Sequence, residues 1–245
     1  MLDAMRAAFG DYAISAEPDL LIDQGRSSHP TGQADLFGSR LAVCSETDDG
    51  RRFAAATMKR LTGGDTIRAR RMRGNFFEFA PSHTLILMTN HRPKVSADDP
   101  AVWRRLRIVP FDVVVDRPDP GLPRRLQSEL PALLAWAYGG WEAYQGRGLD
   151  APAAVMARTE QYRASNDALG RFLEEQTFAG PFHHVRARQL YEAWHQWCYE
   201  VGEQSGTEKD FAERLATRGF AKKRSAAGMT YQGLGLAVEA GEAAS

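Results

Sequence analysis

The chain has 245 residues, of which 43% are apolar and 25% charged, and its formal net charge is zero. This composition is that of an ordinary folded protein with one large domain or two smaller ones. No apolar run approaches the roughly 20 residues of a membrane-spanning helix, and the first residues lack the pattern of a signal peptide. Two cysteines, Cys44 and Cys198, are too few for a disulfide framework or a four-ligand metal site, so we expect buried structural thiols in a cytoplasmic protein.

In residues 1–115, apolar runs that end in polar residues predict a parallel α/β sheet whose strands are buried on both faces. We expect these strands at Arg40–Ser45, His83–Thr89 and Leu106–Val114. Between the first two strands, a helix at about Arg51–Leu61 is followed by a glycine pair that ends it. Residues Ile67–Phe79 alternate around a glycine turn, which predicts a β-hairpin.

The second half of the chain is predicted to be helical and then to form a winged helix. A proline-rich link at Arg117–Pro123 opens a helical linker, 116–167, whose apolar stretch Leu133–Tyr138 we expect in a core. The winged helix spans 168–238, and we expect 239–245 to be a frayed tail.

Three local patterns support the winged helix. One helix has an apolar face, the next has a capping box at Thr207 and Asp210, and the alternating segment Phe220–Leu236 forms the wing. We expect His183 and His184, which follow a proline, in a loop. The apolar helix face consists of Leu190, Trp194, Trp197 and Val201.

Positive charge is concentrated in one stretch of the sequence. Residues 51–107 hold 13 Lys and Arg against four Asp and Glu, a local net charge of about +9. Such a stretch is typical of a site for a polyanion, either nucleic acid or nucleotide phosphate. The alternative is a solvated basic face that the acidic remainder of the chain balances.

Polar residues follow the predicted strands at intervals that suit phosphoryl transfer. Glu46 follows the first strand, where a carboxylate can orient water or a metal ion beside a γ-phosphate. Asn90 follows the second strand, where an amide can hold the attacking water. Arg104 and Arg105 come before the third strand, where a guanidinium can neutralise charge that develops during transfer.

Four segments together resemble the superfamily 3 helicase module of phage and plasmid primase–helicases. Poxvirus primase-type NTPases share this pattern. The segments are Ser45–Gly50, Lys59–Ile67, Met88–Pro93 and Trp103–Phe111. The resemblance covers nearly the whole chain. It implies an α/β fold: a truncated AAA+-like superfamily 3 helicase core, followed by a helical linker and a C-terminal winged-helix domain. It also implies ATP and Mg²⁺ as cofactors, and single-stranded DNA, a homo-oligomeric (hexameric) ring and a primase domain or subunit as partners.

The resemblance also implies roles for single residues. Glu46 matches the Walker B acid that activates water beside the metal, and Ser45 stands where many ATPases carry an aspartate for Mg²⁺. Asn90 matches the sensor 1 residue. Arg105 matches the arginine finger offered to the neighbouring subunit's ATP, with Arg104 as the alternative. The predicted DNA contacts are Lys59, Arg68, Arg70, Arg71 and Arg73, of which the last four belong to the hairpin.

Structural alternatives stay open for each of these residues. The hairpin arginines also suit a charged edge that prevents aggregation, and Asn90 suits an ordinary strand-end turn. Arg104 and Arg105 also suit surface ion pairs, for example with Asp98 or Asp99. The winged helix is mildly basic and suits either DNA contact or protein docking.

The sequence contains no Gly-x-x-x-x-Gly-Lys-Ser/Thr loop for binding phosphates. In the family that loop comes before the Walker B strand, so we expect little ATP hydrolysis from this chain alone. Three readings remain: the C-terminal piece of a longer helicase, a subunit that binds DNA or completes a ring without hydrolysing ATP, and a prophage remnant.

Overall fold

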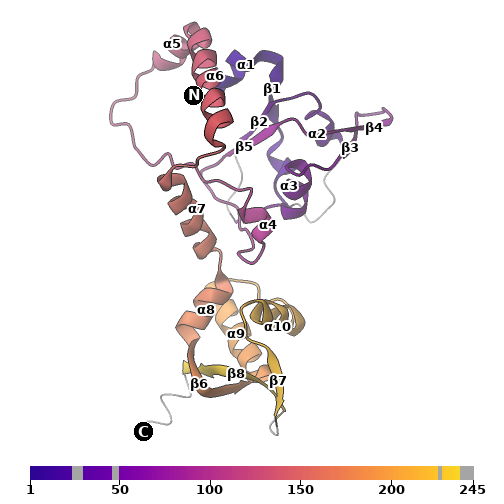
Figure 1. The fold of residues 1–245 in the computed structure, drawn as a ribbon, viewed down its shortest axis with the longest axis vertical. Coiled ribbons are helices and arrows are strands. Elements are labelled where there is room, and N and C mark those ends of the chain that lie inside the picture. The colour runs from indigo at the N-terminus through magenta and orange to yellow at the C-terminus, as the bar shows by residue number, and fades with distance from the viewer. Residues whose placement is uncertain (24–29, 46–49, 226–227, 238–245) are drawn as a thin grey trace. The chain divides into compact units, whose positions relative to one another are not determined.

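The computed structural model describes residues 1–23, 30–45, 50–225 and 228–237. Glu46 and the predicted tail 239–245 lie outside the described residues. Contacts divide the chain into two compact units, Met1–Arg163 and Ala164–Ser245 (Figure 1). The finer division predicted at residues 115 and 167 stays a prediction.

The first unit holds a small sheet, a hairpin and several helices. In chain order its helices are α1 (Leu2–Phe9), the short 3-10 helices Gly10–Tyr12 and Pro18–Leu20, α2 (Pro30–Ala34), α3 (Ala55–Leu61), α4 (Pro100–Trp103), α5 (Leu122–Ser128), α6 (Leu130–Arg147) and α7 (Ala153–Ser165), which continues past the unit's last residue. Its strands are β1 (Ala13–Ala16), β2 (Leu41–Ser45), β3 (Ile67–Arg70), β4 (Phe76–Phe79) and β5 (Thr84–Met88).

Strands β1, β2 and β5 form a parallel sheet in the order β1-β2-β5. The central strand β2 is buried from Leu41 to Cys44, as its unbroken apolar run predicts. Both β2 and β5 confirm predicted strands, and β3 and β4 confirm the predicted hairpin. Because β2 lies between its two neighbours, Ser45 lies at the middle of the sheet's carboxyl edge.

Helix α3 begins at Ala55, four residues later than predicted. The preceding residues pair their backbone with other segments: Phe53 N–H donates to Lys94 O at 2.9 Å, and Ala54 N–H donates to Leu21 O at 2.8 Å. A backbone engaged in these bonds does not enter the helix. After α3, a Cβ at Gly63 would lie 2.9 Å from Lys59 O, so glycine suits this close turn.

The prediction of a third strand at Leu106–Val114 is wrong. Residues 106–115 form no strand, and their contacts go to α7 instead: Ile108 N–H donates to Thr159 Oγ1 at 3.0 Å, and Asp112 pairs with Arg158. A strand needs a neighbour, and among the described strands only β2 pairs with β5. Apolar residues of this segment are therefore left exposed, with Phe111 at 79%.

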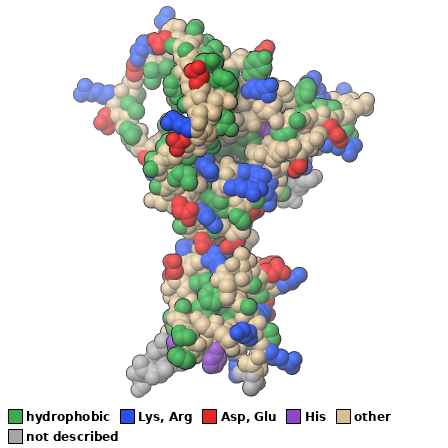
Figure 2. All heavy atoms as spheres, viewed as in Figure 1, with side chains coloured by type: hydrophobic (Ala, Val, Ile, Leu, Met, Phe, Trp, Pro, Cys, Tyr) green, Lys and Arg blue, Asp and Glu red, His purple; other side chains and the backbone are tan. Residues whose placement is uncertain are grey.

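The expectation that Leu133–Tyr138 lies in a core is also wrong. Helix α6 packs against α1, but none of its residues is buried. Trp136 is 64% exposed, and hydrophobic side chains are visible at the surface over α6 in Figure 2. The apolar residues of this helix are not gathered on one face, so the contact with α1 leaves many of them exposed.

The second unit contains α8 (Ala168–Gln176), β6 (Thr177–Arg186), α9 (Ala187–Val201), α10 (Glu208–Thr217), β7 (Lys222–Ser225) and β8 (Gly228–Leu236). Its antiparallel sheet has the order β6-β8-β7. The predicted capping box is present, since Thr207 Oγ1 accepts from Asp210 N–H and Asp210 accepts from Thr207 N–H, both at 3.1 Å. The predicted wing corresponds to β7 and β8.

Most of the predicted apolar face of α9 is buried. Leu190, Trp194 and Trp197 belong to the unit's core, together with Phe172 and Phe211. Val201 is the exception and is exposed, because the helix ends there and Gly202 turns the backbone away at φ 70°. The histidine pair expected in a loop lies in β6, where the register shifts between Ala179 and His184.

Both cysteines are buried and unpaired. Burial raises the pKa of the Cys44 thiol and of the Cys198 thiol to about 11 each. A thiol with so high a pKa stays protonated at neutral pH and is a weak nucleophile. The prediction of two structural thiols is confirmed.

Candidate functional site

Two predicted site residues lie at the same edge of the parallel sheet. Ser45 ends β2 and is in register with Met88, the last residue of β5. Asn90 follows two residues later and is exposed. Parallel strands present their carboxyl ends at one edge, so the sheet brings Ser45 and Asn90 to a common side. Glu46, next to Ser45, is outside the described residues.

The turn that carries Asn90 is closed by its neighbours. Thr89 Oγ1 accepts from His91 N–H at 3.1 Å and donates to His91 O at 2.7 Å. These bonds fix the backbone on either side of Asn90. The exposed Asn90 therefore lies in a hydrogen-bonded turn just past the end of β5.

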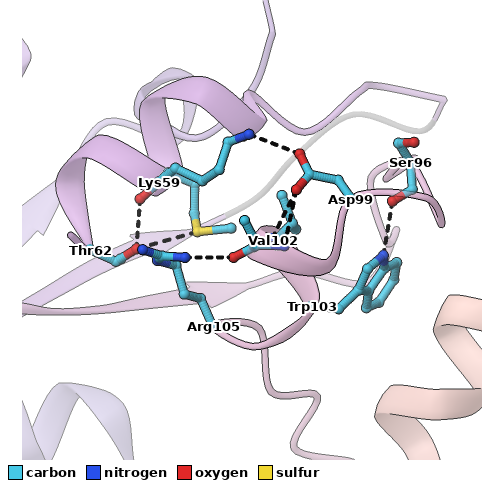
Figure 3. A network of polar contacts seen from close by, with 9 residues as sticks. Lys59, Thr62, Ser96, Asp99, Val102, Trp103 and Arg105 are labelled. Atoms are coloured by element: carbon cyan, nitrogen blue, oxygen red, sulfur yellow. Dashed lines mark hydrogen bonds and ion pairs between the residues drawn. The ribbon is translucent and has the colours of Figure 1, made fainter.

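Arg104 and Arg105 have different surroundings. The guanidinium of Arg105 donates to Ala101 O at 2.8 Å, and its side chain is half-buried (Figure 3). Arg104 follows the last residue of α4 and is exposed. Arg105 is thus held against the preceding helix α4, whereas the Arg104 side chain is exposed to solvent.

Lys59 lies on α3, not on the hairpin, and makes an ion pair. Its Nζ lies 2.9 Å from Asp99 Oδ2 (Figure 3). The other carboxylate oxygen of Asp99 accepts from Ala101 N–H at 3.1 Å and from Val102 N–H at 3.3 Å, which caps α4. Asp99 therefore ties α3 to the start of the helix that leads to Arg104.

The hydrogen bond from Lys59 is the main cause that holds the pKa of Asp99 below its ordinary value of 3.8. A carboxyl with a lowered pKa stabilises the fold above that ordinary value and loses this contribution as the pH falls through the lowered one. The Lys59–Asp99 pair consequently contributes at neutral pH and not in acid.

Asp99→Ala is expected to lower the free energy of unfolding by about 1–2 kcal/mol at neutral pH, because it removes the helix cap and the ion pair together. Asp99→Asn keeps a capping oxygen, so its loss should be about 0–1 kcal/mol. Urea unfolding at neutral pH and in acid measures both effects. An Asp99→Asn loss that persists in acid would show that the ion pair is not its source.

The hairpin β3–β4 projects from the first unit (Figure 1). Its inner face is built on Ile67, Ala69 and Phe79, which are buried. On that face Phe77 and Phe79 meet Phe37 edge to face, each with ring centroids 5.5 Å away. The hairpin is thus anchored by aromatic packing at its base.

The predicted DNA-binding arginines lie on the outer face and the turn of this hairpin. Arg68 and Arg70 are exposed on β3, and Arg71 and Arg73 are exposed in the turn. Arg73 adopts φ 58°, which among the described residues is the single positive value outside glycine. Figure 2 shows basic side chains at the surface along the hairpin and over α4.

One outer-face residue was not among the predicted site residues. Phe76 lies across from Arg70 in the hairpin register. The guanidinium carbons of Arg68 and Arg70 lie 4.6 and 5.1 Å from the centroid of its ring. The alternation of Ile67–Phe79 already places Phe76 on the same face as these arginines, so the sequence carried the signal. By contrast, the sequence carried no signal that Asp99 is the partner of Lys59, because 40 residues separate the two.

Two negative findings hold within the described residues. No group of three or more His, Cys, Asp and Glu side chains is placed to hold a metal ion. No helix there has the length and apolarity needed to span a membrane.

Comparison with known proteins finds similarity to viral proteins that are named as putative helicases. A family model described as a family of unknown function (DUF5906) matches residues 14–105. A protein of Acanthamoeba polyphaga mimivirus, named as a putative helicase, is 26% identical over 197 residues, or 71% of this chain and 20% of the viral protein. A similarly named protein of Frog virus 3 (isolate Goorha) is 28% identical over 180 residues, or 65% of this chain and 18% of that protein.

The chain spans about a fifth of the length of these curated relatives. The similarity supports a helicase-related chain with a mixed α/β core that contains a parallel sheet. The matched family segment runs from β1 to Arg105 and so includes the strand ends, the hairpin and α4.

Proposed function

We propose that this chain is the part of a superfamily 3 replicative DNA helicase, of the phage and plasmid primase–helicase type, that holds single-stranded DNA and senses ATP. One observation carries the proposal. Along the chain, the arginine-bearing hairpin lies between β2 and β5, and these two strands are neighbours in the sheet. In the sequence, Glu46 follows β2 and Asn90 follows β5. A direct connection along the chain suits a machine in which nucleotide chemistry moves a DNA-holding element. The viral relatives named as putative helicases support it.

In this proposal the sheet edge forms the water-activating side of an ATP site. Glu46 orients the attacking water, Asn90 holds it beside the γ-phosphate, and the Ser45 hydroxyl is an oxygen ligand suited to Mg²⁺. The donor set fits that side of the site. No stretch of the 245 residues fits the phosphate-cradling side, because the glycine-rich lysine loop is absent from the sequence.

We assign the role of arginine finger to Arg104 in place of Arg105. A finger must reach the nucleotide of a neighbouring subunit, and Arg104 is exposed while Arg105 is hydrogen-bonded to Ala101 O. The ring that this role requires, a hexamer by resemblance, is part of the proposal. A subunit that donates Arg104 without hydrolysing ATP itself is the second candidate function, and the exposure of Arg104 favours it.

We propose that the second unit is the winged-helix domain of this helicase. Its helices α8, α9 and α10 and its antiparallel sheet with the β7–β8 hairpin support this. Several of its basic side chains have partners within the unit: Lys209 with Glu213, Lys222 with Glu208, and Arg218 with Asp167. This pairing favours protein docking over DNA contact for this unit.

The chain alone is expected to show no ATP hydrolysis above the background rate, with or without single-stranded DNA, because the β- and γ-phosphates have no cradle. Phosphate release over time measures this, and Glu46→Gln and Asn90→Ala should give the same background. Turnover that Glu46→Gln abolishes would contradict the expectation and would mean that another segment of this chain binds the phosphates.

A further inference from the structure

The outer face of the hairpin carries an aromatic ring that folding does not require. Successive residues of a strand alternate between faces, so Arg68, Arg70, Phe76 and Glu78 share the exposed face. The inner face already holds the aromatic packing of Phe77 and Phe79 against Phe37. A polar residue at position 76 would leave that packing intact.

Phe76 stays accessible although two arginines lie over it. Their guanidinium carbons lie 4.6 and 5.1 Å from the ring centroid, yet the residue is 49% exposed. A flat ring flanked by guanidinium groups is the arrangement on which nucleobases stack in single-strand binding proteins. The contact between a base and an aromatic ring is stronger than an exposed cation–π pair, so a base displaces a guanidinium from the ring.

We propose that Phe76 is a stacking site for an unpaired nucleobase, with Arg68 and Arg70 turning from its ring to the flanking phosphates. This inference rests on the proposed DNA binding by the hairpin and adds contact with the bases to contact with the backbone. The ligand class is single-stranded DNA, because bases in a duplex are stacked on one another and do not offer a free face.

The charges of this face indicate that stacking contributes separately from electrostatics. Glu78 lies across from Arg68 in the register, so the face itself holds two arginines and one carboxylate. The turn adds Arg71 and Arg73. Binding should therefore have a salt-dependent part, due to the arginines of the face and of the turn, and a part due to Phe76 that does not depend on salt.

Phe76→Leu tests the proposal, because leucine keeps an apolar side chain and removes the flat ring. The probes are a fluorescently labelled oligothymidylate and an abasic deoxyribose-phosphate strand of the same length, each titrated with the full chain and followed by anisotropy. Phe76→Leu is expected to weaken oligothymidylate binding by about 5- to 150-fold, while the salt slope stays the same. Binding of the abasic strand should not change.

Two controls accompany this variant. Phe111→Leu alters another exposed phenylalanine, outside the hairpin, and should bind both strands like the wild type. Phe76→Tyr keeps an aromatic ring and should retain the preference for oligothymidylate. If Phe76→Leu proves unfolded, the comparison of the two strands with the wild-type chain still tests the stacking.

The outcomes separate the two proposals. If the wild-type protein binds oligothymidylate and the abasic strand with equal affinity, the stacking site is wrong. The proposal that the hairpin binds the DNA backbone is then unaffected. Wild-type protein that binds neither strand overturns both. The stacking site is supported if the wild type prefers oligothymidylate to the abasic strand and if, among the three variants, only Phe76→Leu loses this preference.

Discussion

Neutralising the tip of the hairpin is expected to weaken single-strand DNA binding by on the order of 100-fold at 0.1 M salt. The variant is Arg70→Gln, Arg71→Gln and Arg73→Asn. All three arginines are exposed, so the proposed contacts with phosphates carry no burial cost. Each contact releases counterions and contributes about 0.7 to the slope of log affinity against log salt for a single strand, so the slope should fall by about 2.

The measurement is a series of anisotropy titrations between about 50 and 200 mM salt, a range over which such contacts change affinity strongly. Asparagine is chosen at position 73 because it tolerates the left-handed backbone there. A matched control removes the same charge elsewhere on the surface, with Arg117, Arg124 and Arg147 changed to glutamine. If the slope of log affinity against log salt is the same for the hairpin variant and the wild type, the proposal that the hairpin arginines bind DNA phosphates is refuted.

Trp194→Ala is expected to lower the free energy of unfolding of the second unit by about 3–5 kcal/mol. Trp194 has no exposed surface and lies parallel to Trp197 and to Phe211, with ring centroids 5.6 Å apart in each pair. Its Nε1 also donates to Ser205 O at 2.8 Å. Whole domains are stable by only about 5–15 kcal/mol, so this unit should melt well below the wild type.

Near-ultraviolet circular dichroism during urea unfolding follows this loss. Tyr199→Ala is the matched control, because Tyr199 lies on the same helix, α9, and is 79% exposed. Its effect should stay within about 0.5 kcal/mol. Should both variants unfold at the same urea concentration as the wild type, the core of this unit is not built on Trp194.

Local sequence patterns predicted several elements well. The unbroken apolar runs at β2 and β5, the alternation of the hairpin and the capping box at Thr207 each depend on residues close together in the chain. The burial predicted for β2 and the hydrogen bonds of the hairpin and the capping box are present. The expectation that β5 is buried on both faces is wrong, because β5 is the edge strand of the described sheet and has no buried residue. For this reason the strand ends at Ser45 and Asn90 and the exposed arginines were also predictable as positions.

Other features depend on what lies beside them in space. Leu106–Val114 has the composition of a strand, but it pairs with none and binds α7 through Thr159 instead. The apolar residues of α6 predict a core, but the contact with α1 buries none of them. The bond that holds Arg105 to Ala101 and the ion pair that occupies Lys59 are likewise invisible to motif matching, although each changes how a predicted residue is interpreted.

The backbone at Arg73 has a consequence for how this molecule can be improved or can evolve. A left-handed φ of 58° is unfavourable for arginine by about 1–2 kcal/mol, whereas asparagine or glycine adopts it readily. Selection for thermal stability alone would therefore remove this charge from the hairpin tip. In a library screened for heat resistance, replacements of Arg73 should be enriched, and those same clones should be the ones that release DNA most easily.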